Sequence, residues 1–179
     1  MIIKSVTQVG NPIIRKKSKN VASVKSLSVK KIIKNLTDSM RHSNLVGMAA
    51  PQIGQNLRIF VTEIRKTKFR KKIKELDGLR VFINPKIISR SRKMVSGYEG
   101  CGSVATAGIF GKVPRPYRVT VSAINEKNKK FVFTAKGLLA RVIQHETDHL
   151  DGIVFLDKVA DKKSLMSREE YLKKFRRKK

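Results

Sequence analysis

Two histidines, His145 and His149, stand four residues apart in the segment VIQHETDHLDG, residues 142–152. Residues four apart share one face of an α-helix, and Leu138 and Val142 continue that face toward the N-terminus. Leucine and isoleucine cover an adjacent stripe, so the pattern predicts a buried helix over about 136–150. The core of this chain must therefore accommodate a pair of imidazoles.

Metal binding explains such a pair. Two histidines at this spacing, with glutamate directly after the first, form a helix-borne set of metal ligands. Glu146 adjoins a ligand, so its carboxylate is placed to take a proton from a metal-activated water and pass it to a leaving amine. The segment indicates metal-assisted hydrolysis of an amide, with a third ligand supplied from elsewhere.

Three possibilities compete for the third ligand. A motif that ends in a third histidine would need His at position 155, where this chain has Phe155. A thermolysin-like site would use Glu169 or Glu170, although SREEYLKKF is typical of an exposed amphipathic helix. Cys101 lies between glycines in YEGCGSV, and a thiolate with two imidazoles leaves a fourth position open, as in catalytic sites. The residues favour Cys101.

Chain length and cysteine content set the broad class. With 179 residues, 40% of them hydrophobic, the chain can form one domain with its own core. Cys101 is the sole cysteine, which excludes an intrachain disulfide and fits a reducing compartment. The sequence has neither a leader-like start nor eighteen consecutive apolar residues. We therefore expect a soluble, cytoplasmic, monomeric protein with no membrane association.

Basic residues dominate the charge, because 41 Lys and Arg oppose 13 Asp and Glu for a net charge of +28. Such a charge attracts polyanions such as RNA. The same excess of basic residues would also arise if the proteins of the host were lysine-rich in general. Lys and Arg are absent from three segments, residues 43–57, 94–111 and 142–157. An even distribution of the basic residues along the chain would place about eleven of them there. A bound dication makes nearby ammonium groups costly, and burial in a core excludes them too.

Helix and strand signals occur in turn along the chain. An extended arm at 4–21 precedes a helix over 27–42, and strands follow at 57–64 and 80–85, joined by a basic loop at 65–78. Residues 117–125 and 129–135 flank EKN as a hairpin, and the chain ends in a helix capped by Ser167. We predict an α+β fold with antiparallel sheets around the 136–150 helix, a catalytic domain at 1–163 and a basic helix or tail at 164–179.

Three segments match the motifs of one family in the same order: LVGMAAPQIG at 45–54, EGCGSV at 99–104 and QHETDHLDG at 144–152. QVGNPIIR near the start, FINP at 82–85 and VPRP at 113–116 agree as well. The chain resembles the peptide deformylases over most of residues 6–158. The resemblance implies that the protein removes the N-formyl group from the initiator methionine of nascent chains and releases formate.

The resemblance also implies roles for individual residues. Cys101, His145 and His149 would bind one divalent ion, Fe²⁺ in the cell, with Zn²⁺, Ni²⁺ or Co²⁺ as alternatives in vitro. Glu146 would act as general acid and base, while Gln52 and the backbone N–H of Gly102 would stabilise the oxyanion.

A binding groove for the peptide follows from the same resemblance. The substrate would add as a strand against Val46 and Gly47 on one side and Gly97, Tyr98 and Glu99 on the other. Leu138 and Val142, with His145, would line the methionine pocket. The family pattern also pairs Glu99 with Arg115, which predicts an ion pair behind the cysteine loop.

The chain departs from the family pattern in both loops. Leu45 stands where the motif GxGLAAxQ begins with glycine, and Met48 stands where leucine is usual. Leu45 would impair a positive φ or a close peptide approach at that position. Gly102 replaces a common leucine and keeps the N–H donor while losing rigidity, and VAT at 104–106 lacks the usual Pro-Gly. We expect activity to persist in altered form.

Two other functions remain open from the sequence. One is a metallopeptidase that uses Glu169 or Glu170, and the other is an RNA-binding relative on a degenerate scaffold, which the net charge and Leu45 suggest. The segment KKFRRKK at 173–179 is either a solvated terminus or a contact with ribosomal RNA. His42, in MRHSN, is expected at the surface at a helix end.

Overall fold

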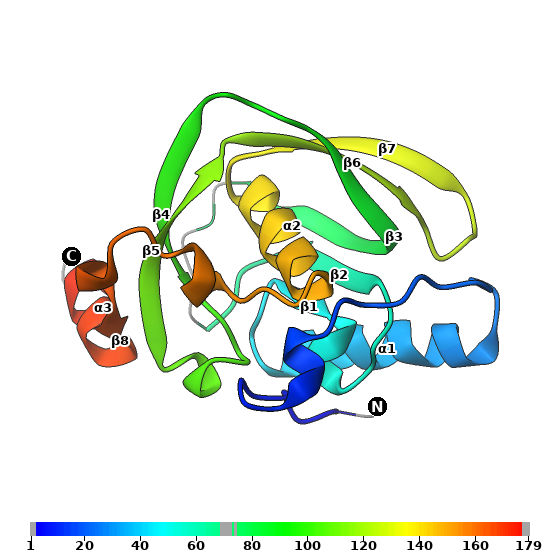
Figure 1. The fold of residues 1–179 in the computed structure, drawn as a ribbon, viewed down its shortest axis with the longest axis horizontal. Coiled ribbons are helices and arrows are strands. Elements are labelled where there is room, and N and C mark those ends of the chain that lie inside the picture. The colour runs from blue at the N-terminus through cyan, green and yellow to red at the C-terminus, as the bar shows by residue number, and fades with distance from the viewer. Residues whose placement is uncertain (1–2, 69–72, 74, 177–179) are drawn as a thin grey trace.

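Two antiparallel sheets and three helices form the part of the chain that the structure describes (Figure 1). The structure is a computed structural model and describes residues 3–68, 73 and 75–176. The larger sheet has the order β1-β2-β3-β6-β7, formed by β1 (Gly47–Ala49), β2 (Ile59–Ile64), β3 (Asp77–Arg90), β6 (Arg118–Ile124) and β7 (Lys130–Lys136). The smaller has the order β4-β5-β8, formed by β4 (Met94–Gly100), β5 (Ile109–Pro116) and β8 (Met166–Ser167). The helices are α1 (Leu27–His42), α2 (Gly137–Leu150) and α3 (Arg168–Arg176), which confirms the predicted α+β class.

The strand β2 is buried on both faces. Ile59 and Val61 pack in the cluster that contains Leu36 of α1, whereas Phe60 packs in the cluster that contains Ile143 of α2. Successive side chains of a strand point to opposite faces, so α1 and α2 cover opposite faces of the larger sheet. An unbroken apolar run such as IFV is what a strand covered on both faces requires.

The helices follow the sequence-based expectations closely. The helix predicted at 27–42 is α1, and Ser26 Oγ accepts the N–H of Val29 at 3.3 Å as its N-cap. His42 ends this helix and is exposed, as expected. The predicted 136–150 helix is α2, which runs between the two sheets in the middle of the molecule (Figure 1). Because Ile143 and Leu150 are fully buried, the histidine-bearing face of α2 has a fixed position.

The hairpin predicted at 117–135 is confirmed as β6 and β7, with Asn128 in the left-handed region at φ 61° in the turn. The predicted strands at 57–64 and 80–85 correspond to β2 and to the middle of β3, which is longer than expected. The basic loop predicted at 65–78 lies in part outside the described residues.

The sequence did not predict β4 or β5. Glycine and serine interrupt β4, and β5 contains Pro114 and Pro116, which usually argue against a strand. In the structure β8 pairs only with Ile109 and Phe110 of β5. Within the described residues, the prolines therefore lie where one edge of β5 has no neighbouring strand, and a missing N–H can be tolerated there.

The C-terminal helix packs against the smaller sheet. Ser167 Oγ accepts the N–H of Glu170 at 3.3 Å, which confirms the predicted cap. Tyr171 stacks on Phe110 of β5 with ring centroids 4.2 Å apart, and Phe175 contacts Tyr98 of β4. The predicted division of the chain at 163/164 remains a prediction. Among the described residues, no helix combines the length and apolar character needed to cross a bilayer.

Candidate metal centre and active site

Cys101, His145 and His149 meet at one point, where the end of β4 approaches α2. The thiol Sγ lies 3.1 Å from His149 Nε2, and the ligand atoms of the three residues lie within 4.8 Å of one another. Cys101 and His149 are almost completely buried. The three predicted ligands therefore form a donor set that suits one small dication.

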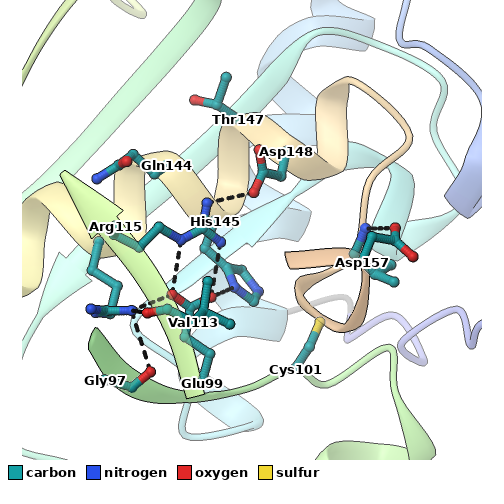
Figure 2. A network of polar contacts seen from close by, with 12 residues as sticks. Gly97, Glu99, Cys101, Val113, Arg115, Gln144, His145, Thr147, Asp148 and Asp157 are labelled. Carbon is teal, nitrogen blue, oxygen red and sulfur yellow. Dashed lines mark hydrogen bonds and ion pairs between the residues drawn. The ribbon is translucent and has the colours of Figure 1, made fainter. Parts of the chain in front are cut away.

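The predicted ion pair between Glu99 and Arg115 is confirmed (Figure 2). Arg115 donates to both carboxylate oxygens at 2.9 Å, and both residues are buried. His145 Nδ1 lies 2.9 Å from Glu99 Oε2, which directs the other ring nitrogen away from Glu99. A carboxylate that holds a metal-ligating imidazole in this way fixes the ring orientation and makes the ligand more basic. Asp148 supports the far side of Arg115 at 2.5 Å.

The charges in this cluster favour metal binding. Burial raises the pKa of the Cys101 thiol, but His149 and His145 outweigh it, so the pKa lies well below its usual range. Burial lowers the pKa of His145, but Cys101 and Glu99 outweigh it, so that pKa lies well above its usual range. Both shifts favour a deprotonated thiol next to positive charge, and a dication bound by these residues would supply that charge.

Glu146 lies beside the cluster on α2. It is buried, and its Oε2 has no hydrogen-bond partner among the described residues. Burial raises the pKa of Glu146 to about 7, so its carboxyl can both release and accept a proton near neutrality. A Cβ at Gly47 would lie 2.4 Å from Glu146 Oε1, so only glycine lets β1 approach this carboxylate so closely.

Gln52 reaches the cluster from the short helix η2 (Ala50–Ile53). Its Oε1 accepts the Ala49 N–H at 2.8 Å, which turns the amide nitrogen toward Cys101 Sγ at 3.5 Å and Ser103 Oγ at 3.3 Å. The side-chain N–H groups therefore point into the space beside the thiol. This is where a donor to a developing oxyanion would be needed.

A cavity of about 80 Å³ opens next to these residues. Eleven of the thirteen predicted site residues line it: Val46, Gly47, Gln52, Tyr98, Glu99, Cys101, Gly102, Leu138, Val142, His145 and Glu146. His149 is buried and does not line the cavity, and Gly97 lines a neighbouring depression with Tyr98 and Tyr171 instead. The structure thus brings the three cation-poor segments together around one cavity.

Arg141 is a lining residue that the sequence did not indicate. Its guanidinium donates to Glu99 Oε1 at 2.7 Å and to the carbonyls of Val113 at 2.9 Å and Val95 at 2.6 Å. A Cβ at Gly97 would lie 3.1 Å from Arg141 Cζ, so the side chain covers the strand where Gly97 leaves space. Arg141 directly precedes the third segment without Lys or Arg. Only its contacts with residues distant in the sequence show that it belongs to the cavity.

The departure at Leu45 does not distort the backbone. Asn44 carries the positive φ of this turn, at 55°, and asparagine tolerates that region. The side chain of Leu45 packs against the α1 cluster and reaches Gly102, where a Cβ would lie 3.2 Å from Leu45 Cδ1. Leu45 itself is not in the left-handed region, so the expected impairment of a positive φ does not arise, and its effect on a close peptide approach stays a prediction.

The alternative third ligands are not part of the cluster. Glu169 and Glu170 are exposed on α3, and Glu170 pairs with Lys173 at 2.6 Å. Within the described residues, the cluster of possible ligands consists of Cys101, His145 and His149. The thermolysin-like arrangement is therefore not supported.

Comparison with known proteins agrees with this geometry. The polypeptide deformylase family model matches residues 3–165. A peptide deformylase from Natranaerobius thermophilus is 35% identical over 161 residues, covering 90% of this chain and 95% of that protein. The crystal structure of peptide deformylase from Thermotoga maritima aligns with a TM-score of 0.79 at 30% identity, covering 90% of this chain and 100% of that one. The Met-Ala-Ser-bound enzyme from Acinetobacter baumannii aligns with a TM-score of 0.83 at 28% identity, covering 88% and 99%. The chain belongs to the peptide deformylase family.

Proposed function

We propose that this protein is a metal-dependent hydrolase that removes the N-formyl group from formylmethionine at the start of nascent polypeptides. The observation that carries the proposal is the cluster of Cys101, His145 and His149 beside Glu146, whose Oε2 has no hydrogen-bond partner among the described residues. Two imidazoles and a thiolate leave a dication one open position, which is the pattern of hydrolytic rather than structural sites. Family membership supports the same reaction.

Cys101, His145 and His149 would hold the metal ion. When bound, the ion would act as a Lewis acid on the formyl carbonyl and make water a stronger nucleophile at neutral pH. A thiolate and two imidazoles suit Fe²⁺ and Zn²⁺ alike, and we take Fe²⁺ as the ion used in the cell. Zn²⁺, Ni²⁺ and Co²⁺ would fill the same site in vitro.

Glu146 would be the general acid and base of the reaction. Its free Oε2 would accept a proton from the attacking water and then return it to the amine that leaves with the peptide. Gln52 would donate from its amide nitrogen, and Gly102 from its backbone N–H, to the oxygen that becomes negative during attack. Formate and a free methionine amine would result.

The peptide would lie between β1 and β4. We propose that Val46 and Gly47 contact it from one side and Gly97, Tyr98 and Glu99 from the other, with Leu138 and Val142 beside the methionine side chain. The apolar stems of Leu138 and Val142 suit an unbranched thioether chain. The Met-Ala-Ser peptide bound to the Acinetobacter baumannii enzyme supports a site for an N-terminal methionine.

The cellular setting follows from the substrate. We propose a monomer in the cytoplasm that meets nascent chains at the ribosome, with its basic surface and C-terminal segment contacting ribosomal RNA. The net charge of +28 supports an encounter with a polyanion.

Formate release from formyl-Met-Ala-Ser tests the proposed reaction. Protein purified without oxygen and loaded with Fe²⁺ should release formate, and Glu146→Ala should lower kcat by about 10²–10⁴-fold because the proton carrier is lost. Glu170→Ala is the matched control, since this exposed carboxylate belongs to the rejected alternative, and should keep wild-type turnover. Cys101→Ser should lose bound metal. If folded, metal-replete wild-type protein released no formate, the enzyme proposal would be wrong and a binding function would be favoured.

A further inference from the structure

The loop that follows Cys101 contains three consecutive left-handed residues. Ala105, Thr106 and Ala107 have φ values of 45°, 51° and 60°, and none of them is glycine. An L-residue in this region brings its Cβ too close to the following carbonyl, so left-handed residues normally occur singly. Such a segment persists only where its surroundings hold it. Here it forms η3 (Ala105–Ala107), which is built on the loop that carries Gly102.

Gln8 of the N-terminal arm binds this loop at both ends. Its Oε1 accepts the N–H of Thr106 at 3.0 Å, and its Nε2 donates to the carbonyl of Gly102 at 2.9 Å. The same nitrogen donates to the carbonyl of Val6 at 2.9 Å, which fixes the amide relative to its own arm. One side chain therefore holds the left-handed residue and the residue beside the metal ligand together.

The arm also joins the two segments proposed to stabilise the oxyanion. The Val9 N–H donates to the carbonyl of Ser103, and the Thr7 N–H donates to the carbonyl of Gln52, both at 2.8 Å. The Val6 methyl groups lie 3.4 and 3.9 Å from the position of a Cβ at Gly102. Residues 6–9 thus limit the freedom that a glycine at position 102 would otherwise have.

We propose that Gln8 is a positioning residue, which holds the Gly102 backbone and the left-handed turn behind it in the geometry needed for turnover. The inference rests on the proposed function, because Gly102 matters only if its N–H faces the reacting oxygen. Hydrogen-bond donors stabilise a developing charge only when they are already in position. Greater mobility of the loop that carries Gly102 should therefore slow the chemical step more than it weakens substrate binding.

The Gln8→Ala variant separates these effects. We expect kcat for formyl-Met-Ala-Ser to fall about tenfold with KM changed less than twofold, and with metal content as in the wild type. Amide hydrogen exchange at residues 102–107 should become faster in the same variant, and this readout needs no activity. Thr106→Gly removes the crowding at the left-handed position, so Gln8→Ala/Thr106→Gly should recover part of kcat and slow the exchange again.

Asn11→Ala is the matched control on the same arm. The Asn11 side chain accepts the Ile13 N–H at the start of η1 (Pro12–Arg15) and, among the described residues, forms no hydrogen bond with the 102–107 loop. The Asn11→Ala variant should therefore keep the wild-type kcat and the wild-type exchange rates at 102–107. The proposal would be overturned if Gln8→Ala kept the wild-type kcat and the wild-type exchange rates. It would also be overturned if Asn11→Ala lost as much kcat as Gln8→Ala and Thr106→Gly restored none of it. Absence of turnover in the wild type would instead remove the proposed function, while faster loop exchange in Gln8→Ala would still establish the contact of Gln8 with the loop.

Discussion

Leu45 and Gly102, two positions where the chain departs from the family motifs, lie in contact. A Cβ at Gly102 would be 3.2 Å from Leu45 Cδ1, and the backbone at Gly102 is outside the left-handed region. Space alone, not backbone conformation, therefore opposes a side chain there. Leu45 fills space beside Gly102 that a side chain at position 102 would otherwise enter, so we expect the two departures to compensate each other.

Exchanging the two residues tests this compensation. Leu45→Gly should leave a void and Gly102→Leu should crowd Leu45, so each should lower the free energy of unfolding by about 1–3 kcal/mol. In the Leu45→Gly/Gly102→Leu variant the new leucine can fill the void, so the loss should be smaller than the sum of the single losses by about 1 kcal/mol. Urea unfolding of the four proteins measures the coupling.

Leu165→Gly combined with Gly102→Leu is the matched control. Leu165 lies against Gly111 near the C-terminal helix, away from Gly102, so these two losses should add. Additive losses in the Leu45 pair as well would show that the contact carries no compensation.

Local motifs identified the metal ligands, but not the residues that hold them. Cys101, His145 and His149 are recognisable because spacing and neighbours carry the chemical signal. Arg141 and Gln8 gain their importance from partners about 40 to 100 residues away, such as Glu99 and Gly102. Arg141 lies outside the matching motifs, and although Gln8 begins the matching segment QVGNPIIR, the local pattern assigns neither side chain a role.

At the scale of elements, the three α-helices and four of the five strands of the larger sheet were predictable, whereas β1 and the smaller sheet were not. The strand β2 and the helix α1 have apolar periodicities that a single segment reveals. The strands β4 and β5 are stabilised by pairing with each other from Met94↔Pro116 to Gly100↔Phe110, although their own composition disfavours strands. Long-range pairing overrode local propensity there.

An ion pair between α1 and β2 should make stability depend on pH. Glu63 binds Arg41 through two hydrogen bonds of 2.9 and 2.7 Å and Arg65 at 3.1 Å. The hydrogen bonds from Arg41 lower the pKa of Glu63 below its usual range despite burial. A carboxylate with a depressed pKa in the folded state stabilises the fold above its unfolded pKa and loses that contribution as pH falls through the folded value.

Glu63→Gln should therefore lower the free energy of unfolding at pH 7 by about 0.5–1 kcal/mol, a small value because Arg41 is half-exposed. The difference from wild type should shrink as pH falls below about 4.5, where Glu63 in the unfolded chain is protonated. Urea unfolding of both proteins between pH 3 and 7 measures this difference in the free energy of unfolding. Glu126→Gln, in the exposed β6–β7 turn, is the control, and an equal trend in that variant would contradict an effect specific to the ion pair.

The charges of the whole molecule are segregated. The three segments without Lys or Arg meet at the cavity, while cations occupy much of the remaining chain. Arg141 is the one lysine or arginine among the described residues that line the cavity, and Glu99 pairs with it. The proposed site for a dication thus has no unpaired Lys or Arg among its described lining residues, and we expect the basic remainder of the chain to attract a polyanion.

The C-terminal cations test that second role. Because α3 packs on β4 and β5 through Tyr171 and Phe175, neutralising charge is a cleaner change than deleting 164–179, which would remove β8 as well. Changing Arg176, Arg177 and Lys178 to Gln should leave hydrolysis of formyl-Met-Ala-Ser intact but weaken binding to ribosomes. It should also reduce the slope of log K against log salt, since fewer counterions are released.

Lys127, Lys129 and Lys130, exposed in the β6–β7 hairpin, give a control variant with the same loss of charge. Sedimentation with ribosomes at several KCl concentrations compares the two triple variants. If net charge alone drew the protein to the ribosome, both would weaken binding equally, because long-range attraction depends on the sum of charges. A larger loss in the C-terminal variant would place the contact beside α3, and equal losses would reject a specific role for this segment.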